Sequence, residues 1–224
     1  MRTLVAAADL LVGAACPGCG HPALAVCARC ARIMRPDPRA VTTVEAAHHL
    51  PIMAAGHHSG VLRRVVVDWK ERGRFPLTEI LAHHLAAAVA AAAADHDEIA
   101  LIPVPTSWVA RWRRGDDLVL SLARATAARL DAVGHRVTVH PVLRRTRRTV
   151  DQVGLGAGDR ARNLHGAFAL DRQRLPAHTP LVMVDDIVTT GSTLAEAARA
   201  LAVRGWGVHG AATVAATPWL RTTG

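Results

Sequence analysis

One segment near the C-terminus, Leu181 to Leu201, constrains the fold of this chain most strongly. It reads LVMVDDIVTTGSTLAEAARAL, in which four apolar residues precede two adjacent carboxylates and a loop of small residues. A short apolar run that ends in a loop predicts a buried strand, which we expect over Leu181–Asp186. The amphipathic spacing that follows predicts a helix over Thr193–Arg204. A strand followed directly by a helix is the repeating unit of α/β folds, so the segment predicts an α/β protein.

The rest of the chain repeats this alternation of strands and helices. The same periodicities predict helices over Gly60–Arg72, Leu77–Ala94 and Asp116–Val133, and strands over Glu98–Pro105, Arg136–Leu143 and Gly207–Ala216. Strands separated by helices pair in parallel, because a crossover helix returns the chain to the same end of the sheet. We therefore predict a mainly parallel sheet flanked by helices.

The loop after the predicted strand has the composition of an anion site. The carboxyl ends of strands in open α/β sheets are where ligands bind, and this end carries Asp185 and Asp186. Small residues that can turn amides and hydroxyls inward follow at the start of the helix: Thr189, Thr190, Gly191, Ser192 and Thr193. The loop lacks the Gly-Lys pair of a Walker A motif. The sequence predicts a monophosphate cradle, and the alternative is a capped strand-to-helix turn with two surface aspartates.

All four cysteines lie close together near the N-terminus. The pattern is CxxC, seven residues, CxxC, formed by Cys16, Cys19, Cys27 and Cys30. Two such pairs can place four thiolates in a tetrahedron around one Zn²⁺ ion, and a closed sphere of protein ligands is typical of a structural site. The alternative is a set of buried or redox-active cysteines. We expect a zinc ribbon with a preceding short helix in residues 1–36, a proline-containing linker near Arg35–Arg39, and a second domain in residues 37–224.

The charge of the chain reflects a strong arginine bias. It has 27 basic and 18 acidic residues, a net charge of +9, and only one lysine, Lys70. Because arginine is frequent everywhere, the charge is weak evidence for nucleic acid binding. The longest uncharged stretch, Ile80 to Ala94, is too short to cross a bilayer, and the N-terminus is a poor signal peptide. We expect a cytoplasmic protein without a membrane span, with its paired histidines on the surface.

The strand, the two acids and the T-T-G-S-T loop resemble the 5-phosphoribosyl-1-pyrophosphate (PRPP) motif of type I phosphoribosyltransferases. Further blocks narrow the resemblance to the ComF family of competence-associated, phosphoribosyltransferase-like proteins, over residues ~14 to 216. These blocks are the tandem CxxC, G-V-L-R-R-x-x-x-x-W-K-E-R-G at Gly60–Gly73, I-P-V-P at Ile102–Pro105 with R-W-R-R-G after it, R-x-x-x-x-x-x-x-Q at Arg144–Gln152, and R-A-R-N-L-H-G-A-F at Arg160–Phe168.

The resemblance implies a site and a reaction. Asp185 and Asp186 would hold the ribose hydroxyls, directly or through Mg²⁺, as catalytic residues, and Thr189 to Thr193 would hold the 5′-phosphate. Phosphoribose would then pass from PRPP to an acceptor with release of pyrophosphate. Candidates for the pyrophosphate site and a closing lid over residues 144–162 are Lys70, Arg111, Arg114, Arg144, Gln152, Arg160 and Asn163. For each arginine and for Lys70 a solvated surface role stays open, and Asn163 is also a candidate helix cap.

The chain departs from the family pattern at two places. Arg114-Gly115 is followed by Asp116-Asp117-Leu118 where family members usually carry F-N-Q, which adds negative charge beside the presumptive pyrophosphate loop. A tyrosine before the G-x-L-R block is also missing, and His57 and His58 stand near its place. Three functions stay open: an active transferase, a non-catalytic sensor of PRPP or another phosphosugar, and a single-stranded-DNA-handling protein that works with competence proteins.

Overall fold

Nine strands and their connections define the fold in the part of the chain that the structure describes. The structure is a computed structural model, and it describes residues 15–43, 50–106, 117–146, 164–171, 175–217 and 222–223. Seven strands form one sheet, in the spatial order β4 (Arg136–Val139), β3 (Glu98–Pro103), β7 (Leu181–Val188), β8 (Gly210–Ala216), β2 (Ile52–Ala54), β1 (Arg39–Val41) and β9 (Thr222–Thr223).

Most of this sheet is parallel. β4, β3, β7, β8 and β2 all run in the same direction, with Leu101 opposite Val182 and Val184 opposite Ala212 in the register of the central strands. β1 is antiparallel to both of its neighbours, β2 and β9. The predicted α/β class with a mainly parallel sheet is therefore confirmed, and the antiparallel edge makes the sheet mixed.

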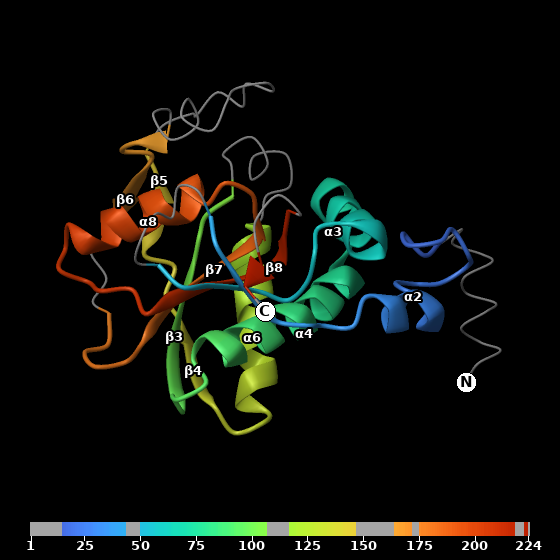
Figure 1. Ribbon diagram of the computed structural model, residues 1–224, viewed down its shortest axis with the longest axis horizontal. Coiled ribbons are helices and arrows are strands. Elements are labelled where there is room, and N and C mark those ends of the chain that lie inside the picture. The colour runs from blue at the N-terminus through green and yellow to red at the C-terminus, as the bar shows by residue number, and fades with distance from the viewer. Residues whose placement is uncertain are drawn as a thin grey trace.

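Helices cover both faces of the sheet (Figure 1). The helices α4 (Phe75–Ala92) and α6 (Leu118–Asp131) pack against one face, where Val182 and Val184 of β7 are buried. The helix α8 (Ser192–Ala202) packs against the other face, where Leu181 and Met183 are buried. Successive side chains of a strand point to opposite faces, so an uninterrupted apolar run supplies both layers of the core.

The structure corrects the boundary of one predicted strand and extends another. Arg136–Leu143 is not a single strand, because β4 ends at Val139 and the separate strand β5 (Leu143–Arg145) pairs with β6 (Phe168–Leu170) in an antiparallel hairpin. Pro141 lies between β4 and β5 and has no amide hydrogen to donate to a sheet. β7 continues two residues beyond Asp186, since Ile187 and Val188 still pair with the end of β8.

The cysteine-rich segment packs directly on the helix that follows β2. This helix, α3, spans Gly60–Arg72 as predicted and ends at Gly73, which has a left-handed φ of 61°. The short helix α2 (Ala28–Ile33) lies beside α3 in Figure 1. Buried residues of the segment share one core with α3, namely Cys16, Cys30 and Met34 with Val61, Leu62 and Val65.

Candidate functional site

The carboxyl edge of the parallel sheet carries the predicted phosphate loop. β7 delivers Asp185 and Asp186 to this edge, and Gly191 caps the start of α8. The φ of Gly191 is 87°, a left-handed value that a residue with a side chain rarely adopts, as the sequence predicted. Within the loop, Oγ1 of Thr190 lies 2.5 Å from Oγ of Ser192. The helix begins at Ser192, so the loop ends at the positive pole of α8.

The two adjacent carboxylates are in different electrostatic environments. Nζ of Lys70 lies 2.8 Å from Oδ1 of the buried Asp186, and the backbone N–H of Asp186 donates to Oδ1 of Asp185 at 2.8 Å. Burial, together with the negative charge of Asp186, raises the pKa of Asp185 to about 8, although Lys70 and Arg145 oppose this rise. This shift favours the protonated form of Asp185, next to Asp186 and its ion pair with Lys70.

This raised pKa predicts a pH dependence of stability. A carboxyl group that keeps its proton in the folded protein and loses it in the unfolded chain makes stability fall as pH rises from about 4 toward 8, by at most ~1.4 kcal/mol per pH unit. We expect Asp185→Asn to remove this decline in protein without Mg²⁺ or PRPP. Urea unfolding at pH 5.5, 6.5 and 7.5 measures how the free energy of unfolding changes with pH. Asp131→Asn, on an exposed aspartate at the opposite edge of the sheet, should keep the wild-type slope, and equal slopes for wild type and Asp185→Asn would contradict the assignment.

Lys70 reaches the site because α3 is fixed next to it. Trp69, the preceding residue, is fully buried, and its Nε1–H donates to Oγ1 of Thr78 in α4 at 2.9 Å. The side chain of Lys70 is 38% exposed and spans the distance to Asp186. The sequence left open whether Lys70 faces a ligand or is a solvated surface residue. In the structure its side chain lies against a carboxylate of β7.

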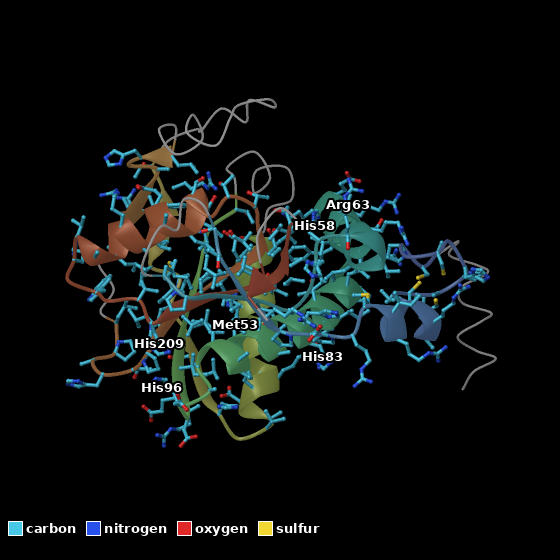
Figure 2. The ribbon with its side chains drawn as sticks, viewed as in Figure 1. Met53, His58, Arg63, His83, His96 and His209 are labelled. Carbon is cyan, nitrogen blue, oxygen red and sulfur yellow. The ribbon has the colours of Figure 1, made fainter. Side chains whose placement is uncertain are left out.

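His58 is a further side chain near the carboxylates. Its backbone N–H donates to the carbonyl of Ala216 at 2.6 Å, which ties the loop after β2 to the end of β8. Figure 2 shows His58 beside Arg63 of α3. Burial lowers the pKa of its imidazole, and the charges of Lys70 and Arg63 add to this effect. Nε2 of His58 is buried and has no hydrogen-bond partner among the described residues.

The prediction that the paired histidines lie on the surface is wrong for His84. Its side chain is 3% exposed, and its ring nitrogens contact the carbonyls of Met34 and Ile80. The alanine-rich sequence around it carries no sign of a buried polar group. Its partner Met34 lies fifty residues earlier, so only the tertiary structure brings the two together.

Two successive arginines of β5 point in opposite directions, Arg144 away from the site and Arg145 toward it. Arg144, the predicted lid residue, is half-exposed and pairs with Asp171 on the surface, with 3.1 Å between Nε and Oδ1. Arg145 points to the other face of the strand, where its Nε–H donates to the carbonyl of Pro105 at 3.1 Å and its guanidinium lies 5.2 Å from the ring centre of Phe168. The alternation of side chains along a strand could have identified Arg145.

Several predicted residues cannot be placed. Arg111, Arg114, Gln152, Arg160 and Asn163 lie outside the described residues, as does Asp116. Asp117, the second acid of the departure from the family pattern, caps the N-terminus of α6, because its Oδ1 accepts from the N–H groups of Val119 and Leu120. A carboxylate at a helix N-terminus is favourable, so a local structural reason accounts for Asp117.

A buried glutamate of α8 anchors the hairpin that flanks residues 147–163. Oε1 of Glu196 accepts the N–H of Gly166 at 2.8 Å, and Arg199 forms two hydrogen bonds to the same carboxylate. We expect Glu196→Ala to cost about 2 kcal/mol locally, since hydrogen bonds to charged groups are among the stronger ones. Amide hydrogen exchange at Gly166 should then become roughly 30-fold faster. Glu79→Ala, which removes an exposed pair with Arg129, is the control, and unchanged exchange at Gly166 in Glu196→Ala would contradict the anchor.

The four cysteines form a compact cluster. One Sγ atom from each of Cys16, Cys19, Cys27 and Cys30 lies within 4.8 Å of the others, and all four are free thiols. Burial opposes ionisation of Cys16, but backbone N–H groups, first that of Cys27, lower its pKa to about 7. Burial and the neighbouring thiols raise the pKa of Cys30 to about 12. Four converging thiols are a donor set that can hold a metal ion such as zinc.

Close packing supports this cluster from the side of α3. A Cβ atom on Gly18 would lie 2.7 Å from Sγ of Cys30 and 2.9 Å from Cγ1 of Val61, so only glycine fits between the cluster and α3. Nε of Arg64 donates to the carbonyl of Gly18 at 2.9 Å, and Nη2 of Arg74 donates to the carbonyl of Leu24 at 2.7 Å. The helix that presents Lys70 is therefore also the support of the cysteine cluster.

Comparisons with known proteins give relatives of one kind. The chain is 32% identical over 151 residues to Competence protein F of Haemophilus influenzae, which covers 65% of this chain and 64% of that protein, slightly less than two thirds of it. It is 33% identical over 193 residues to DNA utilization protein YhgH of Escherichia coli, and 31% identical over 187 residues to the protein of that name from Salmonella typhimurium. Each of these two matches covers 83% of this chain and 77% of the relative.

Two further findings bear on the class of protein. None of the protein-family models compared with the chain matches it. Within the described ranges, no helix combines the length and the apolar character needed to cross a bilayer. The identities and coverage of the relatives, together with the tandem CxxC and the D-D-x-x-T-T-G-S-T segment on which the resemblance was based, establish that the chain belongs to the ComF family.

Proposed function

We propose that this chain binds PRPP at the carboxyl edge of its sheet and has the type I phosphoribosyltransferase fold. The observation that carries the proposal is the continuous unit formed by β7, the acids Asp185 and Asp186, the left-handed Gly191 and the start of α8. The loop Thr189–Thr193 offers hydroxyls and helix amides for the 5′-phosphate. The carboxylates Asp185 and Asp186 are suited to the two ribose hydroxyls, directly or through a cation.

The chemistry of the donors favours Mg²⁺ as the cation that accompanies PRPP. Mg²⁺ prefers carboxylate and phosphate oxygens, and a pair of adjacent acids beside a diphosphate provides both. When bound, the ion would neutralise charge that develops on the departing pyrophosphate. Asp185 has to lose its proton for this role, and the positive charges of Lys70 and Arg145 favour that ionisation.

The transfer that we propose breaks the bond between C1 of the ribose and the pyrophosphate oxygen, and forms a bond between C1 and an acceptor. Lys70 holds Asp186 in a fixed position, and Arg145 adds positive charge at the same edge of the sheet. Arg111, Arg114, Arg144, Gln152, Arg160 and Asn163 stay candidates for the pyrophosphate and for a lid. If no acceptor is used, the same site would act as a sensor of PRPP.

We also propose that the four cysteines hold one structural Zn²⁺ ion and that residues 1–36 and 37–224 are the two units of the chain. Support comes from the convergence of the four Sγ atoms and from the pKa of Cys16 near 7, which eases loss of its proton. All four ligands come from the protein, so the ion would be closed to substrate. One zinc per chain by elemental analysis is expected, and less than 0.2 would contradict the assignment.

A thermal melt with PRPP and Mg²⁺ tests the proposed function. A ligand that binds only the folded state adds about 2.7 kcal/mol of stability at a hundredfold excess over its Kd, which is roughly 5–11 °C for a domain of this size. Ribose 5-phosphate alone should give a smaller shift. No shift with millimolar PRPP and Mg²⁺ would exclude both transferase and sensor, and release of pyrophosphate over a panel of bases separates the two.

The names of the relatives support a role for this chain in competence or DNA utilisation. We propose that it acts in the cytoplasm. A second candidate function is handling of single-stranded DNA, favoured by three exposed arginines along one side of α2 and its end, Arg29, Arg32 and Arg35. Contacts to phosphates release counterions, so the affinity should fall steeply between 50 and 200 mM salt. Undetectable binding of an oligothymidylate at 50 mM salt would exclude this function.

A further inference from the structure

A cavity of about 320 Å³ lies between the cysteine-rich segment and the α/β sheet, separate from the two aspartates. One wall comes from the end of α2 and the chain that follows it, including Met34 and Arg35. The opposite wall comes from the loop after β2 and the first turn of α3, including His57 and Leu62. The volume is within the range of small-molecule sites, and the described residues that line it include none from β7.

The loop from Gly56 to His58 separates this cavity from the carboxylate site. Gly56 accepts the N–H of Ala216, and His58 donates its own N–H to Ala216, so the loop continues the parallel pairing with β8. Side chains of extended backbone alternate in direction. His57 lines the cavity, while His58 is close enough to Lys70 and Asp186 for their charges to change its pKa. The two sites are therefore on opposite sides of one loop.

Among the described residues that line the cavity, apolar side chains are combined with two arginines and one aspartate, Arg35, Arg39 and Asp37. Half of the lining residues are aliphatic side chains, namely Ile33, Met34, Val41, Ala54, Val61, Leu62 and Ala216. Nε and Nη2 of Arg39 donate to Oδ2 of Asp37 at 2.9 and 2.7 Å, so these two charges offset one another. Arg35 adds a further positive charge, and the first turn of α3 in the same wall has no acidic residue and no side-chain cap from Ser59.

We infer that this cavity binds a small organic monocarboxylate with an apolar or aromatic body. A guanidinium binds a carboxylate through two parallel hydrogen bonds, and the excess of one arginine over aspartate among the described lining residues matches a single negative charge. The apolar walls bury the rest of the molecule and contribute most of its affinity. Because both units of the chain supply walls, the ligand binds only when the cysteine-rich segment is docked on α3. This inference does not depend on PRPP binding.

The probe for the test is 2-naphthoate, added to the full zinc-loaded chain and followed by calorimetry and by amide chemical shifts. We expect binding in the micromolar to millimolar range, with the largest shifts at the amides of Gly56 and Gly60. The neutral analogue 2-naphthylmethanol should bind at least tenfold more weakly. Absence of 2-naphthoate binding at 5 mM, or equal affinity for the alcohol, would overturn the inference.

Two variants, Arg35→Gln and Ser59→Phe, and one control variant, Arg32→Gln, test whether the probe binds in this cavity. Arg35→Gln should weaken 2-naphthoate at least tenfold, while Arg32→Gln, on an exposed arginine of α2 outside the cavity, should stay within twofold of wild type. Ser59→Phe should block the cavity sterically without removing a charge, and it loses no helix cap because Ser59 makes none. Equal losses in Arg35→Gln and Arg32→Gln, or full affinity in Ser59→Phe, would place the probe elsewhere. All variants should keep their melting temperature and their response to PRPP.

Discussion

Replacement of Cys30 by serine is expected to lower the melting temperature of the protein by roughly 6–12 °C. Cys30 is 1% exposed and belongs to the same core as Val61 and Val65 of α3, so we expect loss of the proposed Zn²⁺ ion to expose part of that core as well. Loss of a structural metal is one of the few changes that cost about 3 kcal/mol or more, and 1 kcal/mol corresponds to 2–4 °C for a chain of this size.

Calorimetry and zinc analysis of the same samples measure this effect. The matched control is Ala31→Ser, which places a hydroxyl at the next, exposed position of α2 and should change the melting temperature by less than ~2 °C. Chelation of zinc from the wild type should reproduce the loss seen in Cys30→Ser. If Cys30→Ser has the same melting temperature as the wild type, and the wild type contains no zinc, the cluster is a set of thiols that holds no metal.

Replacement of Asp186 by asparagine is expected to abolish stabilisation by PRPP and Mg²⁺. Asparagine has the same shape but no charge, so it cannot form the ion pair with Nζ of Lys70, 2.8 Å away in the wild type, and its neutral amide oxygen is a weaker ligand for Mg²⁺ than a carboxylate. At a ligand concentration of 100 Kd the wild type gains about 2.7 kcal/mol, and we expect the variant to gain less than ~0.3 kcal/mol. Titration calorimetry of both proteins measures the difference directly.

Asp131→Asn is the matched control for this experiment. Asp131 accepts the N–H of Val137 at the opposite edge of the sheet, and an amide oxygen can accept the same bond. This control should retain the full gain from PRPP. A wild-type gain in Asp186→Asn would show that the adjacent acids do not bind the ligand, whereas an equal loss in both variants would indicate a general effect of charge.

The sequence alone predicts those parts of the fold that rest on local patterns. The run from Leu181 to Leu201 predicts the strand, the left-handed glycine and the helix, because each follows from residues next to one another in the chain. α3 was predicted with its exact bounds, since its apolar spacing is regular and a glycine ends it. The convergence of the four cysteines likewise follows from the spacing of their two CxxC pairs.

Elements that depend on distant partners were not predicted. β1, β2 and β6 have three residues each, too few to show an alternating pattern, and each exists because another strand offers hydrogen bonds. The division of Arg136–Leu143 between two sheets also depends on distant partners, because β4 pairs with β3 and β5 pairs with β6. The helix α2 is short, and Cys30 within it and Met34 at its C-cap share a buried core with residues of α3.

The candidate site likewise contains residues that local sequence patterns identify and residues that only the tertiary structure brings together. Asp185, Asp186 and the loop were located by local pattern. Lys70 was selected because it is the single lysine of the chain and lies in the family-like block Gly60–Gly73. Its ion pair with Asp186 joins residues more than a hundred positions apart. Arg145 was not selected, although the alternation of side chains along β5 could have distinguished it from Arg144. His58 was noted only because it stands near the place of the missing tyrosine, and its approach to Lys70 and Asp186 depends on the tertiary structure.

A crystal structure of the chain with PRPP and Mg²⁺ tests the proposed binding site directly. We expect density for the 5′-phosphate within hydrogen-bond distance of the loop Thr189–Thr193, and for the ribose hydroxyls or their cation at Asp185 and Asp186. Density for PRPP at another surface, with Asp186 still paired with Lys70, would contradict the proposed site.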